Sequence, residues 1–261
     1  TDGLDESFLA LRPLIMSGLG PLAGSQGPEQ PLVSQAASVL LDWDGSTDPD
    51  SSAPTLYQSL LTSLMNLLLS REMSPATLAF LHFYFNSDPL LFGMLSDLSN
   101  PAWKDRTIRR GEQPADVVAH AFRISVAALR ERYGNKMSDW TWRRAAPVTL
   151  ANPLGAVPGF GWTNRSGIPP RGAANTVWVH KYDRKDLARF PVIYGPGLRL
   201  VVDFNDLPRS FISIPGGESG RPDSQHYADL LPLFEKGQGA GLELDPQAVA
   251  ANAEELLIFS K

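Results

Sequence analysis

The chain has 261 residues, 43% of them hydrophobic and 20% charged, and it contains no cysteine. This length and apolar content suffice for a buried core in one large or two modest domains. The formal net charge is -5 and the 23 basic residues are spread along the chain, so we expect no nucleic-acid partner. Without cysteine there can be no disulfide, thiolate nucleophile or thiolate metal site.

No segment is predicted to enter a membrane. The longest apolar runs, such as residues 64–69, are far too short to span a bilayer. The chain begins at Thr1-Asp2-Gly3, without an initiator Met or a signal-like segment. Such a start is expected of an internal piece of a longer precursor, or of a trimmed product.

Residues 1–150 are predicted to be mainly helical. Apolar residues recur there at helical spacing, as in Val118, Phe122 and Leu129. Ser74-Pro75 and Asn100-Pro101 are expected helix starts, because proline fits the first helical position and the residue before it can cap free N–H groups. Pro13, inside the first apolar segment, is expected to mark a break or a first turn.

Residues 151–261 are predicted to be rich in β-structure. After an irregular loop over residues 152–171, short alternating and β-branched runs indicate strands over residues 175–182, 191–194, 198–204 and 211–214. Asn205 to Pro208 is expected to form a hairpin turn, and a final helix is expected from Pro246 to Leu257 with Asp245 as its cap. Helices that precede the strands in this way indicate an α+β fold.

The most informative stretch is Pro215 to Asp229, which follows the strand-like run from Gly195 to Phe204. It reads Pro-Gly-Gly-Glu-Ser-Gly-Arg-Pro-Asp-Ser-Gln-His-Tyr-Ala-Asp. A glycine-rich polar turn that ends in His-Tyr-x-Asp resembles the C-terminal signature of penicillin acylase-type amidases, which are N-terminal nucleophile hydrolases. We call residues 215–229 the signature turn.

Shorter motifs support the resemblance by their order and spacing. Leu41 to Gly45 is similar to the family's Trp-Asp-Gly segment. Arg132 to Gly134, followed by Trp140-Thr-Trp142, resembles its Tyr-Gly and Trp-x-Trp pattern. Asn175 to Val177 resembles the strand entry that follows a Gly-rich loop.

Three positions depart from the family pattern. Glu218 stands where the family usually has Gln, Leu230 follows Asp229 where Gln is common, and Arg143 replaces the Gly after Trp-x-Trp. These departures concern the substrate class more than the fold.

The resemblance implies a four-layer αββα core, with this chain as the C-terminal half of the large (beta) chain. It implies hydrolysis of an acyl amide, such as a β-lactam side chain or an acyl-homoserine lactone, and hence a role in antibiotic chemistry or quorum quenching. The implied partners are the rest of the parent enzyme, namely its small chain and the N-terminal half of its large chain, and the small-molecule substrate. The implied location is periplasmic or secreted.

The implied chemistry uses a Ser freed by self-cleavage, with its own α-amino group as base. In the family those residues lie upstream of this stretch, so no catalytic residue is assigned here and the isolated chain is expected to be inactive. Thr1 could be drawn as such a nucleophile, but Thr1-Asp-Gly-Leu-Asp-Glu indicates a polar lead-in to a helix.

The candidate site residues are those of the signature turn, as cleft-flanking or structural elements: Glu218, Ser219, His226, Tyr227 and Asp229. An alternative is an independent serine hydrolase with Ser219, His226 and Asp229 as its triad, although Gly217 to Arg221 lacks the second glycine of a Gly-x-Ser-x-Gly elbow. A further alternative is a non-catalytic scaffold whose exposed sheet edge binds a partner strand.

No metal or cofactor is expected in this chain. The acidic run Asp42, Asp44, Asp48 and Asp50 does not match a calcium-binding EF-hand loop, because Ala53 stands where the loop needs Glu. A solvated turn is the better interpretation. The histidines are scattered, without the His-Glu-x-x-His spacing of a zinc site.

Overall fold

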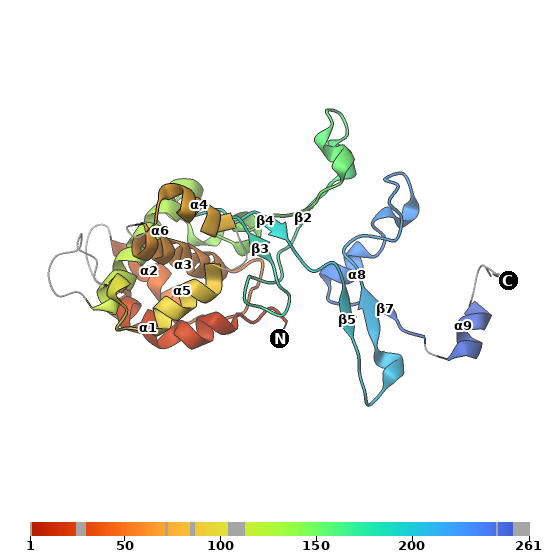
Figure 1. Ribbon diagram of the computed structural model, residues 1–261, viewed down its shortest axis with the longest axis horizontal. Helices are drawn as coiled ribbons and strands as arrows, with labels where there is room; N and C mark the ends of the chain where they lie inside the picture. Colours follow the sequence, from red (N-terminus) through yellow and green to blue (C-terminus); the bar gives the residue numbers. More distant parts are fainter. Residues whose placement is uncertain are drawn as a thin grey trace. The chain divides into compact units, whose positions relative to one another are not determined.

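A computed structural model describes residues 2–24, 30–70, 73–83, 87–103, 113–243 and 245–252 (Figure 1). In the described chain seven α-helices precede the first strand, a short one precedes the last strand and another follows it. Within the described residues, every helix is too short or too polar to cross a bilayer. The α-helices are α1 (Glu6–Ala23), α2 (Gln30–Leu41), α3 (Ala53–Leu69), α4 (Pro75–Phe83), α5 (Ser87–Ser96), α6 (Pro114–Tyr133), α7 (Trp142–Ala145), α8 (Leu231–Glu235) and α9 (Pro246–Asn252).

The described strands are short and form small sheets. β1 (Val148–Leu150) pairs with β2 (Arg165–Ile168), and β3 (Lys181–Tyr182) pairs antiparallel with β4 (Val192–Tyr194). The third sheet has the order β5-β6-β7 and is antiparallel throughout. Its strands are β5 (Arg199–Val201), β6 (Phe211–Ser213) and β7 (Ala240–Gly241). Helices followed by antiparallel strands confirm the α+β fold class.

The chain divides into two compact units. The first, which we call the helical unit, comprises Thr1–Thr149 and Arg165–Gly195. The second, which we call the C-terminal unit, comprises Leu150–Asn164 and Pro196–Lys261. The expected division at residue 150 was drawn where helices give way to strands. The compact units are instead defined by which residues pack together, and by that criterion residues 165–195 belong with the helices.

Helix α3 forms the centre of the helical unit. Every residue from Ala53 to Met65 is buried, so this helix is enclosed on all sides. Helix α6 packs against both α3 and α1, and α1 also packs against α2. At the contact of α1 with α6, Gly18 lies so close that an added Cβ would come within 2.7 Å of the Val118 side chain. The two helices can approach this closely because Gly18 has no side chain.

Aromatic side chains anchor the two apolar clusters of the helical unit. In the larger cluster the rings of Phe8, Trp43 and Tyr57 lie 4.4 to 5.5 Å apart, centroid to centroid. In the smaller one Trp142 meets Tyr182 edge to face at 5.6 Å, beside Phe190. Trp43 comes from the Trp-Asp-Gly segment and Trp142 from the Trp-x-Trp pattern, so both motifs supply core packing.

Several expected boundaries are confirmed and one expected break is wrong. The amide of Thr77 bonds to Ser74 Oγ at 3.1 Å at the start of α4, and the turn after β5 joins it to β6 as expected. However, α1 continues through Pro13. Pro13 is on the exposed side of the helix, so the carbonyl that loses its amide partner to the proline can be solvated. The opposite side of the helix buries Leu11 and Ile15.

The strand expected over residues 175–182 is mostly wrong, because only β3 at its end is regular. The Thr176 hydroxyl accepts the Ala173 amide at 3.0 Å and donates to the Trp178 carbonyl at 2.7 Å. These side-chain bonds replace a strand ladder with a local turn. The loop expected over residues 152–171 is also more regular than predicted, since it contains β2.

A buried polar network joins α1, α3 and the segment after β3. Asp5 caps α1 by accepting the amides of Ser7 and Phe8 at 3.1 and 3.3 Å. The Gln58 side chain donates to Asp5 Oδ2 at 3.4 Å, and its Oε1 accepts a hydrogen bond from Arg184 at 3.2 Å. Asp5 is 0% exposed and Arg184 is 3% exposed. Gln58 therefore bridges a buried carboxylate and a buried guanidinium, each of which would be costly alone.

Burial gives Asp5 an unusual proton affinity. Desolvation raises the pKa of Asp5 to about 6, against the opposing effects of its hydrogen bonds with Ser7 and Phe8 and of the Arg184 charge. The Asp5 carboxyl is therefore protonated more often in the folded chain than in the unfolded chain at pH values between 3.8 and about 6. In this window the stabilising contribution of Asp5 is largest at low pH and is lost as the pH rises through about 6.

Replacement of Asp5 by Asn should flatten this pH dependence. As the pH is lowered from about 7 to about 4, the free energy of unfolding of the helical unit should rise in the wild type by up to about 3 kcal/mol more than in Asp5→Asn. This figure follows from about 1.4 kcal/mol for each unit by which the pKa of Asp5 is raised. Urea unfolding followed by circular dichroism measures the difference. Glu6→Gln, which removes an exposed carboxylate from the same turn, is the control and should keep the wild-type slope. Equal slopes for wild type and Asp5→Asn would contradict the assignment.

Candidate functional site

Backbone hydrogen bonds close the signature turn on itself. The Gly216 carbonyl accepts the Leu230 amide at 2.9 Å, and the Ser219 amide donates to the His226 carbonyl at 3.0 Å. Gly217 lies against the second half of the turn, where an added Cβ would overlap the His226 carbonyl oxygen and lie 2.5 Å from Asp229 Oδ1. Glycine is therefore needed at position 217 so that the two halves of the turn can touch.

His226 and Asp229 form an exposed pair at the end of this turn. Their Nδ1 and Oδ2 atoms are 2.8 Å apart, and the side chains are 58% and 39% exposed. The hydrogen bond from His226 holds the pKa of Asp229 below its usual value. On its other side the His226 ring contacts the Gln225 amide at 3.0 Å. At this exposure the pair orients the imidazole but adds little stability.

Tyr227 ties the signature turn to residues 150–164 within the C-terminal unit. Its hydroxyl donates to the Thr163 carbonyl at 2.7 Å and accepts from Asn152 Nδ2 at 2.8 Å. Asn152 in turn accepts the Leu154 amide at 2.9 Å, and its own amide donates to Asn164 Oδ1 at 2.9 Å. The sequence placed Tyr227 in the turn but gave no signal for its partners, which lie more than sixty positions earlier in the chain.

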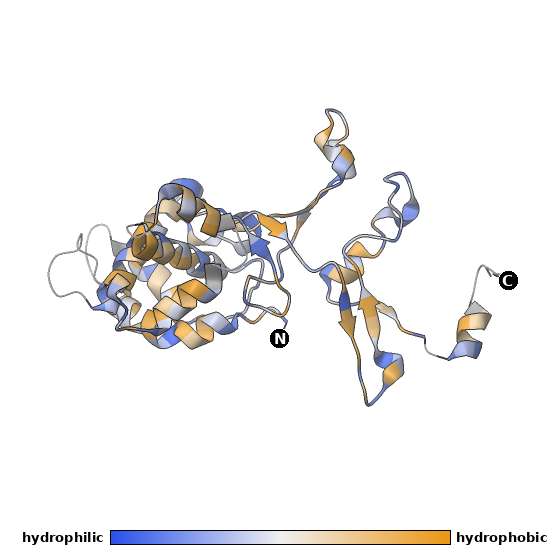
Figure 2. Ribbon diagram, in the orientation of Figure 1, coloured by the Kyte–Doolittle hydropathy of each residue, from blue (hydrophilic) through white to orange (hydrophobic). Residues whose placement is uncertain are grey.

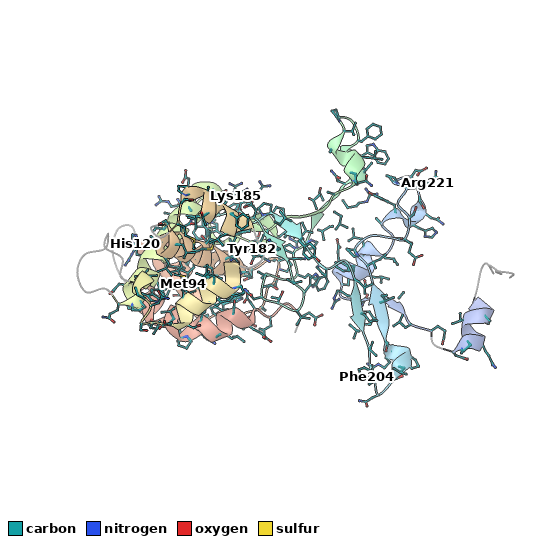
Figure 3. The ribbon with its side chains drawn as sticks, in the orientation of Figure 1. Met94, His120, Tyr182, Lys185, Phe204 and Arg221 are labelled. Atoms are coloured by element: carbon teal, nitrogen blue, oxygen red, sulfur yellow. The ribbon has the colours of Figure 1, made fainter. Side chains whose placement is uncertain are left out.

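Ser219 is not arranged as a nucleophile with His226. Its hydroxyl accepts the Arg221 amide at 3.2 Å, and among the described residues no hydrogen bond joins it to the His226 ring. Arg221 pairs instead with Asp223, at 2.7 Å, on the exposed side of the turn (Figure 3). Glu218 is also exposed. The turn thus brings Ser219, His226, Tyr227 and Asp229 together through backbone contacts without placing the Ser219 hydroxyl on a base.

The acidic run is used for local turns and one surface pair. Asp44 accepts the Ser46 amide and Asp48 accepts the Asp50 amide, each at 2.8 Å. Asp50 forms a two-pronged pair with Arg143, the residue that departs from the family's Gly. In the part of the chain that the structure describes, no three acidic or His side chains gather as a metal site would require.

His180 is a packing residue. It is 4% exposed, and burial lowers its pKa to about 4, so the ring is neutral near pH 7. Gly195 lies against it, since an added Cβ there would be 3.1 Å from the ring. This contact gives a structural reason for the Gly195 that opens the strand-like run matched to the family.

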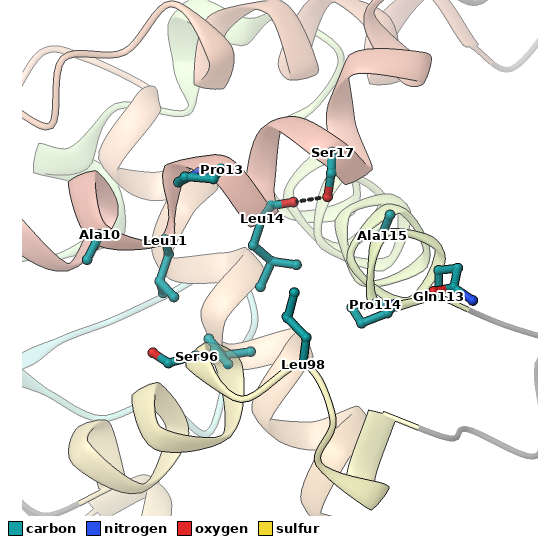
Figure 4. Close-up of a pocket in the computed structure, with 11 residues that line it drawn as sticks. Ala10, Leu11, Pro13, Leu14, Ser17, Ser96, Leu98, Gln113, Pro114 and Ala115 are labelled. Carbon is teal, nitrogen blue, oxygen red and sulfur yellow. Dashed lines mark hydrogen bonds between the residues drawn. The ribbon is translucent and has the colours of Figure 1, made fainter.

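A cavity of about 500 Å³ lies within the helical unit, between α1, the end of α5 and the start of α6 (Figure 4). The residues that the structure places around it include no titratable group, and the Ser17 hydroxyl is already bonded to the Leu14 carbonyl at 2.6 Å. It offers apolar surface without groups for acid–base chemistry. Its lining is formed by Ala10, Leu11, Pro13, Leu14, Ser17, Leu95, Ser96, Leu98, Gln113, Pro114 and Ala115.

Comparison with known proteins places this geometry in context. The penicillin amidase family model matches residues 2–251. The acyl-homoserine lactone acylase QuiP of Pseudomonas syringae pv. tomato is 28% identical over 221 residues, which cover 82% of this chain and 26% of that protein. QuiP of Pseudomonas aeruginosa is 25% identical over 234 residues, covering 82% and 27%. The chain therefore spans about a quarter of the length of these relatives.

A solved structure has a similar fold. A thermostable penicillin G acylase from Alcaligenes faecalis matches with a TM-score of 0.59 and 18% identity, over 100% of this chain and 48% of that one. At this identity the likeness shows the fold alone. It agrees with the α+β arrangement described above.

Gly217→Ala should disrupt the signature turn. The added methyl group would force the 216–219 backbone away from His226, because the overlapping atom is a carbonyl of the chain itself. Hydrogen exchange of the Ser219 and Leu230 amides should accelerate. Gly220→Ala in the same turn is the matched control, since its Cβ would meet nothing within 4 Å. Equal exchange in both variants would show that close packing at Gly217 is unimportant.

Ser219 should not react with a fluorophosphonate probe. With its hydroxyl accepting a backbone amide and no base bonded to it, it has no activation beyond that of an ordinary serine. Mass spectrometry of the treated chain, with Ser219→Ala as control, measures this. Labelling that disappears in the variant would establish the serine hydrolase alternative.

Proposed function

This chain belongs to the penicillin amidase family, and from that membership we propose that it forms part of an enzyme hydrolysing a linear acyl amide. The observation that carries the proposal is the match to acylases along 82% of the chain. Acyl-homoserine lactones are the first substrate class, because the relatives carry that name. Amides of β-lactam side chains are the second, because the structural neighbour is a penicillin G acylase.

In the proposed reaction the nucleophile is an N-terminal serine of the parent protein. Its hydroxyl attacks the amide carbonyl, and its α-amino group takes up the proton, since that group has a pKa of roughly 7.7–8. Backbone N–H and Asn side-chain donors stabilise the oxyanion. The amine leaves with a proton, and water then hydrolyses the acyl-enzyme ester to release the acid.

We assign the nucleophile and the oxyanion donors to sequence outside this chain. The signature residues fit a supporting role, because Ser219, His226 and Tyr227 are engaged in holding the turn and its link to residues 150–164. Glu218 and Asp229 are the side chains of this turn that would flank a cleft. The chain is accordingly a C-terminal part of the large chain and is inactive alone.

The remaining features of the proposal follow from the same assignment. The partners are the small chain and the N-terminal half of the large chain, which together with this chain would build a four-layer αββα core, and a small-molecule acyl amide. The net charge of -5 argues against a nucleic-acid partner. We propose no membrane insertion, no cofactor, since the serine and its amine suffice for the chemistry, and a periplasmic or secreted location for the parent.

The test is hydrolysis by the protein encoded by the whole gene. That protein should release homoserine lactone and the free acid from an acyl-homoserine lactone, or a side-chain acid from a penicillin, as followed by liquid chromatography and mass spectrometry. This chain alone, at equal concentration, should release neither. Turnover by the isolated chain would overturn the assignment of the nucleophile to absent sequence, and an inactive whole protein would overturn the proposed reaction.

A further inference from the structure

The C-terminal unit buries little apolar surface for its size. Among its described residues the buried hydrophobic side chain is Phe234, at 5% exposure, whereas both apolar clusters found in the described residues lie in the helical unit. A unit of this length ordinarily depends on a core of its own to offset the loss of conformational entropy. The C-terminal unit therefore needs a further surface to pack against.

Large apolar side chains that such a surface would cover are exposed on the hairpin of β5 and β6. Leu200 is 53% exposed and its cross-strand neighbour on β6 is Ile212. Leu198 and Val202 flank β5 two positions before and after Leu200, and they are 51% and 38% exposed. We call the residues Leu198, Leu200, Val202 and Ile212 the hairpin face. Figure 2 shows hydrophobic colour along this hairpin.

The tip of the hairpin is apolar as well, and its other face is mixed. Phe204, at the end of the hairpin (Figure 3), is 88% exposed, and Val201 on the opposite face is 40% exposed. A hairpin with one wet face would carry polar side chains at alternate positions. The opposite face does so, since Arg199 and Ser213 pair across the two strands there. The exposed apolar side chains are therefore concentrated on the hairpin face and the tip.

β5 is also an outer strand of its sheet. It stands first in the order β5-β6-β7, so within the described residues one side of its backbone carries no ladder hydrogen bonds. Natural edge strands are commonly protected by charged residues or proline. β5 has Arg199 as its charged residue, next to Leu200 and Val201. An apolar edge of this kind is suited to pairing with another strand.

We propose that the hairpin face and the outer edge of β5 dock on the portion of the parent protein that lies outside this chain, and that this contact completes the core of the C-terminal unit. The inference rests on the proposal that the chain works within a larger enzyme. Length supports this partner, since the whole chain covers 48% of the acylase chain, and 82% of it covers 26% of the QuiP relative. A similar fold is therefore found within much longer chains. The absent portion of the parent protein supplies an apolar layer that covers the hairpin face and a strand that pairs with the outer edge of β5.

Hydrogen exchange compares the two states directly. The peptide that spans residues 198–204 should exchange at least about tenfold more slowly in the whole protein than in the isolated chain. The peptide that spans residues 118–129 of α6 lies in the core of the helical unit and should exchange equally in both. Equal exchange of the hairpin peptide in both states would overturn the proposal. Protection that rises with the concentration of the isolated chain would also overturn it, because the occupant would then be a second copy.

A charge placed on the hairpin face provides a second test. Leu200→Asp should leave the circular dichroism of the isolated chain unchanged, because the side chain is exposed there, but should abolish the hairpin protection in the whole protein. Met16→Asp, on α1 and 48% exposed, is the matched control and should keep that protection. A Leu200→Asp protein that retains the protection would contradict the docking surface.

Activity separates this inference from the proposed function. A whole protein that hydrolyses amides while its hairpin exchanges as freely as in the isolated chain would refute the docking surface alone. A whole protein with a protected hairpin and no hydrolysis of any acyl amide would refute the proposed reaction alone.

Discussion

The enclosure of α3 determines how the helical unit is built. In a helix buried on every side, each polar group that stays unpaired is costly. Most of the large polar groups of α3 are paired, whereas the hydroxyls of Thr55 and Ser59 have no partner among the described residues. Ser63 meets Ser125 of α6 at 2.8 Å, and Gln58 is held between Asp5 and Arg184. The last contact fixes the segment after β3 to the helices. This explains why residues 165–195 belong to the helical unit although they contain strands.

Sequence patterns predicted the features that depend on nearby residues. The Ser74-Pro75 helix start and the turn between β5 and β6 both follow from local spacing and side-chain type. The failures involve tertiary contacts. Burial of one face carries α1 through Pro13, and the Asp5–Gln58–Arg184 network joins residues 53 and 126 positions apart, for which periodicity gives no signal.

In the signature turn, too, local features could be predicted and contacts with distant residues could not. Its residues could be selected from the sequence, and the need for Gly217 follows once the two halves of the turn are seen in contact. The bonds from Tyr227 to Thr163 and Asn152 could not be predicted, because they cross from one loop to another. They show that a side chain links the turn to residues 150–164, whereas backbone bonds close the turn on itself.

This arrangement bears on how a supporting segment contributes to catalysis. Groups that position a substrate must be held within a fraction of an ångström, which requires packed surroundings. In the C-terminal unit, hydrogen bonds fix the signature turn locally, but Phe234 is the buried apolar anchor among the described residues. Its rigidity must then come from what covers Leu200 and its neighbours. In the proposed enzyme, a substitution in the hairpin would therefore act on the chemistry through assembly, whereas one at Glu218, which we propose to flank the cleft, would act beside the substrate.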